Sequence, residues 1–382
     1  MSGPMYLDNA ATTPVRREVL EAMMPYWRGT FGNPSSHHEV GEQAASALAD
    51  ARARVAAVLG VRTGDVIFTS GGTEGNNLAV KGVALGAMLA RGRRHVVTTA
   101  IEHESILESV SALERLHGFE ATILDVDDTG RVSPDAVAAA VREDTALVTV
   151  GYANNETGTV QDVRAIAAVT ASARVPLHLD AVQAAGWLPL SGTGADAITI
   201  AGHKLGAPKG IGAAAIRGRI PVEPILHGGG QERGRRSGTE DVAGAVGLAT
   251  ALELAEAERA ASAARVGAAR DAFVAEVLAT VPSATLTGHP TERLPATASF
   301  TFAGTSGEAV LLELERRGIV SSSGSACAAG SDEPSHVLVA MGISPEVAQT
   351  AVRFTFPHDL AVDLAPVAEA VAASVAAVRS AT

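Results

Sequence analysis

The sequence of 382 residues is poor in three features: it has one cysteine, fewer basic than acidic residues, and no apolar run of 18 residues. A single cysteine excludes internal disulfides. The formal net charge of −12 argues against broad binding to nucleic-acid phosphates. Without a long apolar run we expect no membrane-spanning helix. Residues 1–13 have neither a basic start nor an apolar segment, so we expect no secretory signal and a cytoplasmic protein.

The composition is that of a globular protein, with 47% apolar and 19% charged residues. Strand-like and helix-like segments alternate between residues 66 and 200, which indicates a mainly parallel sheet with helices on both faces. The predicted strands are 66–69, 95–99, 121–124, 146–150, 175–179 and 197–200. The predicted helices are 16–26, 40–59, 74–88, 105–116, 134–141 and 163–172.

The pattern changes after residue 230. A single long helix is predicted over 242–280, followed by strands at 298–302 and 352–356 and helices at 307–317 and 364–379. The length predicts one large and one small domain. We expect a large α/β domain over 15–255 and a small α+β domain formed by 1–14 and 256–382, with the N-terminal arm packed on the small one.

Lys204 directly follows the predicted strand 197–200, within Gly202-His203-Lys204. The carboxyl edge of an open α/β sheet is where such proteins bind ligands. A lysine at this edge is placed to form an imine with an aldehyde cofactor, of which pyridoxal phosphate is the obvious candidate. A lone lysine near glycines is more often a solvated loop residue, so the interpretation depends on the other strand ends.

Two other predicted strands end on polar residues. Asp180 follows strand 175–179 and could hold a protonated pyridine nitrogen, with Gln183 facing the same site if a helical turn begins there. The alternative is a helix-capping aspartate beside an exposed glutamine. His103 follows strand 95–99, where it could stack on a flat ring and shuttle protons, or simply lie on an acidic surface loop.

Two loops offer groups that bind anions. In Ser70-Gly71-Gly72-Thr73-Glu74 the glycines permit close approach and the exposed N–H groups favour a phosphate, although such turns are common. In Asn154-Asn155-Glu156, after strand 146–150, the amides could bind a phenolic oxygen or a carboxylate, or only form a turn.

The C-terminal third adds an arginine and the single cysteine. Arg353 alternates with apolar residues on a predicted strand, which suits recognition of a substrate carboxylate, or protection of a sheet edge. Cys327 lies in the glycine- and serine-rich stretch 321–331, where little could bury it, so we expect a displaced or poorly ordered loop that carries a reactive thiol.

These motifs together resemble the cysteine desulfurases of the NifS/IscS type, in the class V aminotransferase superfamily of pyridoxal-phosphate enzymes. The resemblance runs from Tyr6 to Arg353. The motifs that carry it are Tyr6-Leu7-Asp8-Asn9-Ala10-Ala11-Thr12-Thr13-Pro14, Gly32-Asn33-Pro34-Ser35-Ser36, Phe68-Thr69-Ser70-Gly71-Gly72-Thr73-Glu74, Asn154-Asn155-Glu156, Gly202-His203-Lys204, His227-Gly228-Gly229-Gly230-Gln231-Glu232, Arg236-Ser237-Gly238-Thr239 and Ser323-Gly324-Ser325-Ala326-Cys327.

The resemblance implies the fold-type-I architecture of pyridoxal-phosphate-dependent transferases, with a large domain built on a mainly parallel seven-stranded-type sheet and a smaller α+β domain. It implies a Schiff base between pyridoxal 5'-phosphate and Lys204, with Asp180 on the pyridine nitrogen, Gln183 on the ring hydroxyl, and His103 stacked on the ring as acid and base. The other residues implied at the cofactor are Gly72, Thr73, Asn155, His203 and Thr239 of the partner subunit.

The resemblance also implies a substrate and a reaction. Asn33, Asn155 and Arg353 would orient the carboxylate of L-cysteine. Cys327 would receive the sulfur as a persulfide while L-alanine leaves, and the sulfur would pass to an acceptor. The enzyme would be a homodimer with its site at the subunit interface, and no metal site is expected.

The chain departs from the family pattern at two places near the cofactor. Ala201 replaces the usual serine, which removes one phosphate-binding hydroxyl, and Glu74-Gly75-Asn76 replaces the usual Glu-Ser-Asp. Other class V enzymes, namely a selenocysteine lyase, an aminotransferase or an epimerase, are alternatives, as is a non-catalytic pyridoxal-phosphate-binding protein. The sequence does not distinguish between four kinds of sulfur acceptor: an iron–sulfur scaffold, a tRNA-thiolating enzyme, a DNA-modifying system and a biosynthetic carrier.

Overall fold

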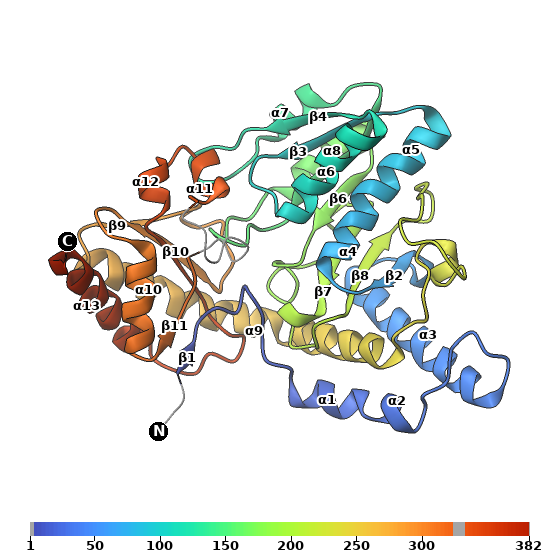
Figure 1. Ribbon diagram of the computed structural model, residues 1–382, viewed down its shortest axis with the longest axis horizontal. Coiled ribbons are helices and arrows are strands. Elements are labelled where there is room, and N and C mark those ends of the chain that lie inside the picture. The colour runs from blue at the N-terminus through green and yellow to red at the C-terminus, as the bar shows by residue number, and fades with distance from the viewer. Residues whose placement is uncertain (1–3, 324–332, 382) are drawn as a thin grey trace.

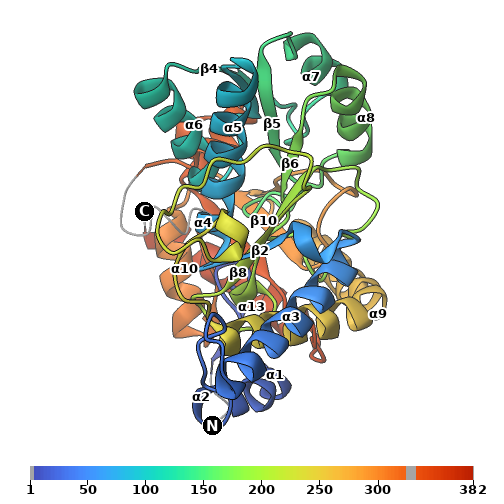
Figure 2. The same cartoon turned by 90° about the vertical axis from the view of Figure 1, so that its right-hand side faces the viewer.

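The centre of the molecule is a seven-stranded sheet (Figures 1 and 2). The computed structural model describes residues 4–323 and 333–381. In spatial order the strands are β2 (Val66–Thr69), β8 (Gly212–Ile216), β7 (Ala197–Ala201), β6 (Leu177–Asp180), β5 (Thr145–Gly151), β3 (His95–Thr99) and β4 (Glu120–Leu124). The neighbouring strands from β7 to β4 are parallel, whereas β8 runs antiparallel to both β7 and β2. The carboxyl ends of all strands except β8 therefore meet at one edge.

Helices cover both faces of this sheet. One face packs against α4 (Gly72–Asn77), the π-helical turn η2 (Leu78–Gly82), α5 (Val83–Arg91) and α6 (Glu104–His117). The other packs against α3 (Glu39–Leu59), α7 (Pro134–Ala140), α8 (Val163–Ala173) and the first part of α9 (Val242–Thr280). Adjacent strand residues enter opposite cores: Leu147 faces α5, while Val148 faces the other layer. This double burial explains the continuous apolar runs in the strand sequences.

Helix α9 runs from the large sheet to a smaller antiparallel one (Figure 1). The small sheet has the order β12 (Ala351–Thr355), β10 (Thr297–Phe302) and β9 (Ala284–Leu286). On α9, the ring of Phe273 meets those of Phe300 and Phe354 edge to face, with centroids 6.0 and 5.2 Å apart. The remaining helices of this region are α10 (Gly307–Arg316), α11 (His336–Ala340), α12 (Pro345–Ala348) and α13 (Ala365–Ala381).

The N-terminal arm lies between the two sheets. Strand β1 (Met5–Tyr6) pairs in parallel with β11 (Ile319–Val320), and Asp8 forms an isolated bridge with Thr355 of β12. The arm then leads into α1 (Arg17–Met23) and α2 (Pro25–Arg28), which pack near α9. The three-residue 3-10 turns are η1 (Thr63–Asp65), η3 (Gly202–Lys204) and η4 (Glu232–Gly234).

The predicted α/β architecture is confirmed, and each strand predicted between residues 66 and 200 is present, with bounds that differ by at most two residues. Strand β8 was not predicted, because its sequence Gly-Ala-Ala-Ala-Ile is rich in residues that are depleted in strands. The predicted helix 16–26 divides into α1 and α2, where Pro25 starts a new helix. The division at residue 255 stays a prediction. No helix within 4–323 or 333–381 has the length and apolar character needed to cross a membrane.

Candidate active site

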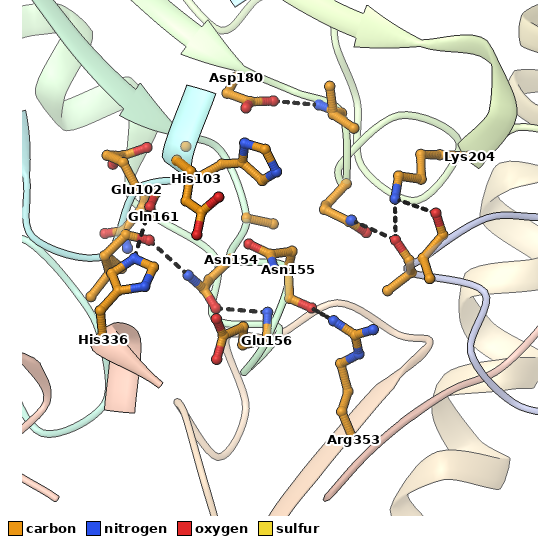
Figure 3. A pocket seen from close by; sticks show the side chains of 18 residues that line it. Glu102, His103, Asn154, Asn155, Glu156, Gln161, Asp180, Lys204, His336 and Arg353 are labelled. Atoms are coloured by element: carbon orange, nitrogen blue, oxygen red, sulfur yellow. Dashed lines mark hydrogen bonds between the residues drawn. The ribbon is translucent and has the colours of Figure 1, made fainter. Parts of the chain in front are cut away.

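Side chains from four strand ends meet in one cavity of about 250 Å³, the central cavity (Figure 3). Asp180 ends β6, Lys204 ends η3 just after β7, and His103 follows β3. Of the residues predicted for the site, those that line the cavity are His103, Asn155, Asp180, Gln183, Lys204 and Arg353. The edge of the large sheet therefore gathers an amine, a carboxylate and an imidazole around one space, and the small sheet adds a guanidinium.

The N-terminal arm holds Lys204 in place. The Lys204 Nζ atom donates hydrogen bonds to the carbonyl oxygens of Ala10 and Ala11, the latter at 2.8 Å. The arm is itself fixed to the lysine turn, because the N–H of Thr13 donates to the carbonyl of His203 at 2.9 Å. Gln183 joins this network by donating from Nε2 to the Ala10 carbonyl at 3.1 Å. The amine therefore lies at the cavity wall between two segments distant in sequence.

Both carboxylate oxygens of Asp180 accept hydrogen bonds. Oδ1 accepts from the N–H of Val182 at 3.0 Å, which caps the turn after β6. Oδ2 accepts from Nδ2 of Asn76 on α4 at 2.6 Å. Asp180 thus caps a turn and also lines the central cavity. A capping role is therefore compatible with the predicted role as partner of a pyridine nitrogen.

Arg353 reaches the cavity from β12, and its side chain is 1% exposed. One terminal nitrogen, Nη2, lies 2.6 Å from Oδ1 of Asp8 in the N-terminal arm. The other, Nη1, donates to the backbone carbonyl of Asn155 at 2.8 Å. These contacts hold the guanidinium at the cavity in a fixed orientation, which suits recognition of a planar carboxylate.

A second hollow, the cradle, lies where β2 meets α4 beside the lysine turn. It includes Gly72, Thr73 and His203. Gly72 packs so closely that a Cβ atom there would lie 2.8 Å from Cγ2 of Val182. Burial, and then the nearby lysine charges, lower the pKa of His203 to about 4, so its ring is neutral near pH 7. Its Nδ1 lies 3.2 Å from the hydroxyl of Thr12.

Two buried acids line the central cavity that sequence reasoning did not single out. Glu102 is 4% exposed and accepts a hydrogen bond from the Thr99 hydroxyl at 2.7 Å. Burial, together with the charge of Asp180, raises its pKa to about 8. Glu156 is equally buried, which raises its pKa, and it accepts from the Ser335 hydroxyl at 2.5 Å. The available signals were their position after parallel strands and, for Glu156, its place in the Asn154-Asn155-Glu156 motif.

Two predicted site residues lie outside these hollows, and a third lies outside the described residues. Asn33 is exposed, and its Oδ1 accepts from the N–H of Ser35 at 2.9 Å. Thr239 is also exposed and lines neither the central cavity nor the cradle. Cys327 lies outside the described residues, so the prediction of a displaced loop stays untested.

Comparison with known proteins assigns this arrangement to a family. A model of the class-V aminotransferase family matches residues 5–360. The cysteine desulfurase IscS of Dictyoglomus turgidum is 43% identical over 357 residues, which cover 93% of this chain and 90% of that protein. A solved NifS-like protein has a TM-score of 0.88 at 34% identity, covering 99% of both chains. The structure of SspA in complex with cysteine has a TM-score of 0.80 at 35% identity, covering 92% of this chain and 99% of SspA. The chain therefore belongs to the class-V aminotransferase family.

Proposed function

We propose that this chain is a pyridoxal-phosphate-dependent cysteine desulfurase, which converts L-cysteine to L-alanine and passes the sulfur to an acceptor. The observation that carries the proposal is the meeting of Lys204, Asp180, His103 and Arg353 around one cavity at the carboxyl edge of the sheet. Family membership supports the cofactor, and the relatives named cysteine desulfurase support the reaction.

The residues present fit pyridoxal phosphate. The cradle has a glycine where a Cβ atom would collide with Val182, and the first N–H groups of the continuous helix α4–η2–α5 are suited to an anion. Asp180 supplies a carboxylate that would hold a protonated ring nitrogen. When bound, the cofactor supplies an aldehyde that links to amines and a ring that withdraws electrons from the substrate Cα. The residues that would hold it are Gly72, Thr73, His103, Asn155, Asp180, Gln183, His203 and Lys204.

The substrate carboxylate would bind to Arg353. The guanidinium is buried and oriented by Asp8 and the Asn155 carbonyl, so little freedom is lost on binding. Asn155 would add a side-chain amide, and Asn33 would join from its exposed loop. A buried arginine would favour an amino acid over an amine that lacks a carboxylate.

The proton and sulfur steps use side chains of this chain. Lys204 or His103 moves the proton at Cα of the bound cysteine. The Cys327 thiolate attacks the substrate sulfur, so that an S–S bond forms while the substrate C–S bond breaks. The electron pair of the broken bond stays with the substrate, which takes up a proton and leaves as L-alanine. Cys327 keeps the sulfur as a persulfide for an acceptor protein.

The assembly would be a homodimer in the cytoplasm. Thr239 is exposed and away from its own cradle, as expected of a residue that reaches the cradle of the other copy as Thr239 of the partner subunit. Large apolar side chains between α1 and α2, on α2 and in the following loop support a contact surface: Met24, Trp27 and Phe31 are 56%, 53% and 68% exposed. The acceptor could belong to iron–sulfur assembly, tRNA thiolation, DNA modification or biosynthesis.

Two variants test the proposal. Wild-type protein should be yellow from bound pyridoxal phosphate, and Lys204→Ala should lose that absorbance. Cys327→Ser should keep the colour and bind cysteine, yet form almost no persulfide or sulfide. Mass spectrometry after one turnover should find one extra sulfur on the Cys327 peptide of the wild type. Alanine and sulfide released at the wild-type rate by Cys327→Ser would instead indicate a lyase that expels sulfur or selenium directly.

A further inference from the structure

A chain of hydrogen bonds connects two residues of the central cavity through two that no motif assigns. Nδ2 of Asn76 donates to Oδ2 of Asp180 at 2.6 Å and to Oγ of Ser105 at 2.9 Å. Oγ of Ser105 lies 2.9 Å from Nδ1 of His103. Asn76 is 2% and Ser105 7% exposed, so water does not compete for these contacts. The chain therefore links the carboxylate at the end of β6 to the imidazole after β3.

The direction of each hydrogen bond follows from which atoms can donate. The backbone N–H of Ser105 points at Nδ1 of His103 at 3.1 Å, as part of the cap of helix α6. A backbone N–H only donates, so Nδ1 must offer a lone pair, and the proton of the neutral ring is on Nε2. The Ser105 hydroxyl accepts from Asn76, which leaves its own proton available for the same lone pair.

The orientation of Asn76 is set by Asp180. A carboxylate only accepts, so the amide must turn its nitrogen, not its oxygen, toward Oδ2. The two protons of this nitrogen then serve Asp180 and Ser105, one each. An ionised aspartate, the residue usual at this place in the resembled family, could not donate to Asp180. The asparagine thus allows both residues of the cavity to be ordered by one amide.

We propose that Asn76 and Ser105 are positioning residues that hold neutral His103 as the Nε2–H tautomer and tie its ring to the Asp180 carboxylate. His103 lines the central cavity, and the hydrogen bonds that its ring makes within residues 4–323 and 333–381 are both at Nδ1, from the Ser105 hydroxyl and the Ser105 N–H. The neutral ring therefore presents a proton donor, and not a base, to the cavity. This tautomer, taken together with the proposed function on which the inference rests, assigns removal of the Cα proton to Lys204 and delivery of a proton to His103.

The tautomer can be measured without cofactor or substrate. Protein labelled with ¹⁵N in the histidine rings is examined by two-dimensional NMR, and the His103 signals are assigned from their loss in His103→Gln. We expect a single Nε2–H form in the wild type. Ser105→Ala and Asn76→Ala should shift the Nδ1 resonance, because they remove or release the hydroxyl contact while the Ser105 backbone N–H stays. Ser105→Thr, which keeps the hydroxyl, should restore the wild-type pattern.

Ser109→Ala is the matched control. Ser109 is a buried serine one turn along the same helix, and it donates to the Ser105 carbonyl at 2.6 Å without meeting His103. It should leave the His103 signals unchanged, which separates positioning from a general effect on α6. An Nδ1–H form or an even mixture in the wild type overturns the proposal, and so do variants with unaltered His103 signals.

Kinetics keep this inference separate from the proposed function. If cysteine is the substrate, Ser105→Ala and Asn76→Ala should lower kcat about tenfold or more with little change in KM, and Ser109→Ala should do neither. The expected tautomer in a protein that does not turn over cysteine would refute the proposed function alone. Cysteine turnover by a protein whose His103 carries its proton on Nδ1 would refute only the inference. Should Asn76→Ala fail to fold, the Ser105→Ala and Ser105→Thr pair still decides.

Discussion

Replacing Glu102 with glutamine should stabilise the protein, and increasingly so as the pH rises from 5 to 8. The carboxyl is buried beside Asp180, and its pKa is raised from 4.5 to about 8. In the unfolded chain the same group ionises near pH 4.5. Between these values the folded state binds one proton more than the unfolded state, so wild-type stability falls as pH rises. Glutamine resembles the protonated acid and titrates in neither state.

The magnitude follows from the size of the shift. One pKa unit corresponds to about 1.4 kcal/mol, so the stability advantage of Glu102→Gln should grow by up to about 1.4 kcal/mol per pH unit in this window. Between pH 6 and pH 8 the increase should be roughly 2 kcal/mol, because the slope falls off near the folded-state pKa. Above pH 8 both states release the proton, and the difference should level off.

Urea unfolding at pH 6, 7 and 8 and at one protein concentration measures this difference. Glu104→Gln is the control, since Glu104 lines the same cavity but is exposed. It should change stability equally at all three pH values. A Glu102→Gln curve that runs parallel to that control would show that Glu102 is already ionised at pH 6 in the folded protein, and the assignment of a neutral acid would be wrong.

Three further substitutions test other parts of the site and its support. Glu232→Ala should lower the free energy of unfolding by about 3–5 kcal/mol, because it leaves the buried Arg52, 2.5 Å from Glu232 in the wild type, without its carboxylate. Urea unfolding measures this, and replacing the exposed Glu21 of α1 with alanine should have no measurable effect. Asp180→Ala should lower cysteine turnover far more than tenfold, a loss above about 1.4 kcal/mol in the barrier; turnover within tenfold in a steady-state alanine assay would refute its role. Arg353→Ala should mainly raise KM for cysteine, and an unchanged KM would move the carboxylate site elsewhere.

Residue periodicity predicted most of the large sheet, because strands buried on both faces carry continuous apolar runs between glycine-rich loops. It failed at β8, whose three alanines carry little strand preference. That strand lies between β2 and β7, where tertiary burial decides the conformation. The short β9 and β11 also escaped prediction, since two or three residues make no recognisable period.

The residues of the candidate site could be predicted where a reactive side chain follows a strand of the parallel sheet. Lys204, Asp180 and His103 each lie at or just after the carboxyl end of a parallel strand. Because these ends meet at one edge of the sheet, we could expect the three side chains to lie close together. Asn76 and Ser105 could not be found in this way, because their role depends on α4 and α6 lying side by side. A single sequence carries no record of which helices become neighbours.

The contact between Asp8 and Arg353 also constrains how the protein can be made. These residues are 345 positions apart in sequence, and their ion pair is one of the two contacts that orient the Arg353 guanidinium at the cavity. During synthesis the arm emerges long before Arg353, so the large sheet can form well before this contact. A ribosome-bound chain truncated before β12 should therefore hold a folded sheet and its lysine turn but no oriented arginine. Under the proposed function, the cavity would bind the carboxylate of an amino acid only after β12 has been released and has paired with the arm.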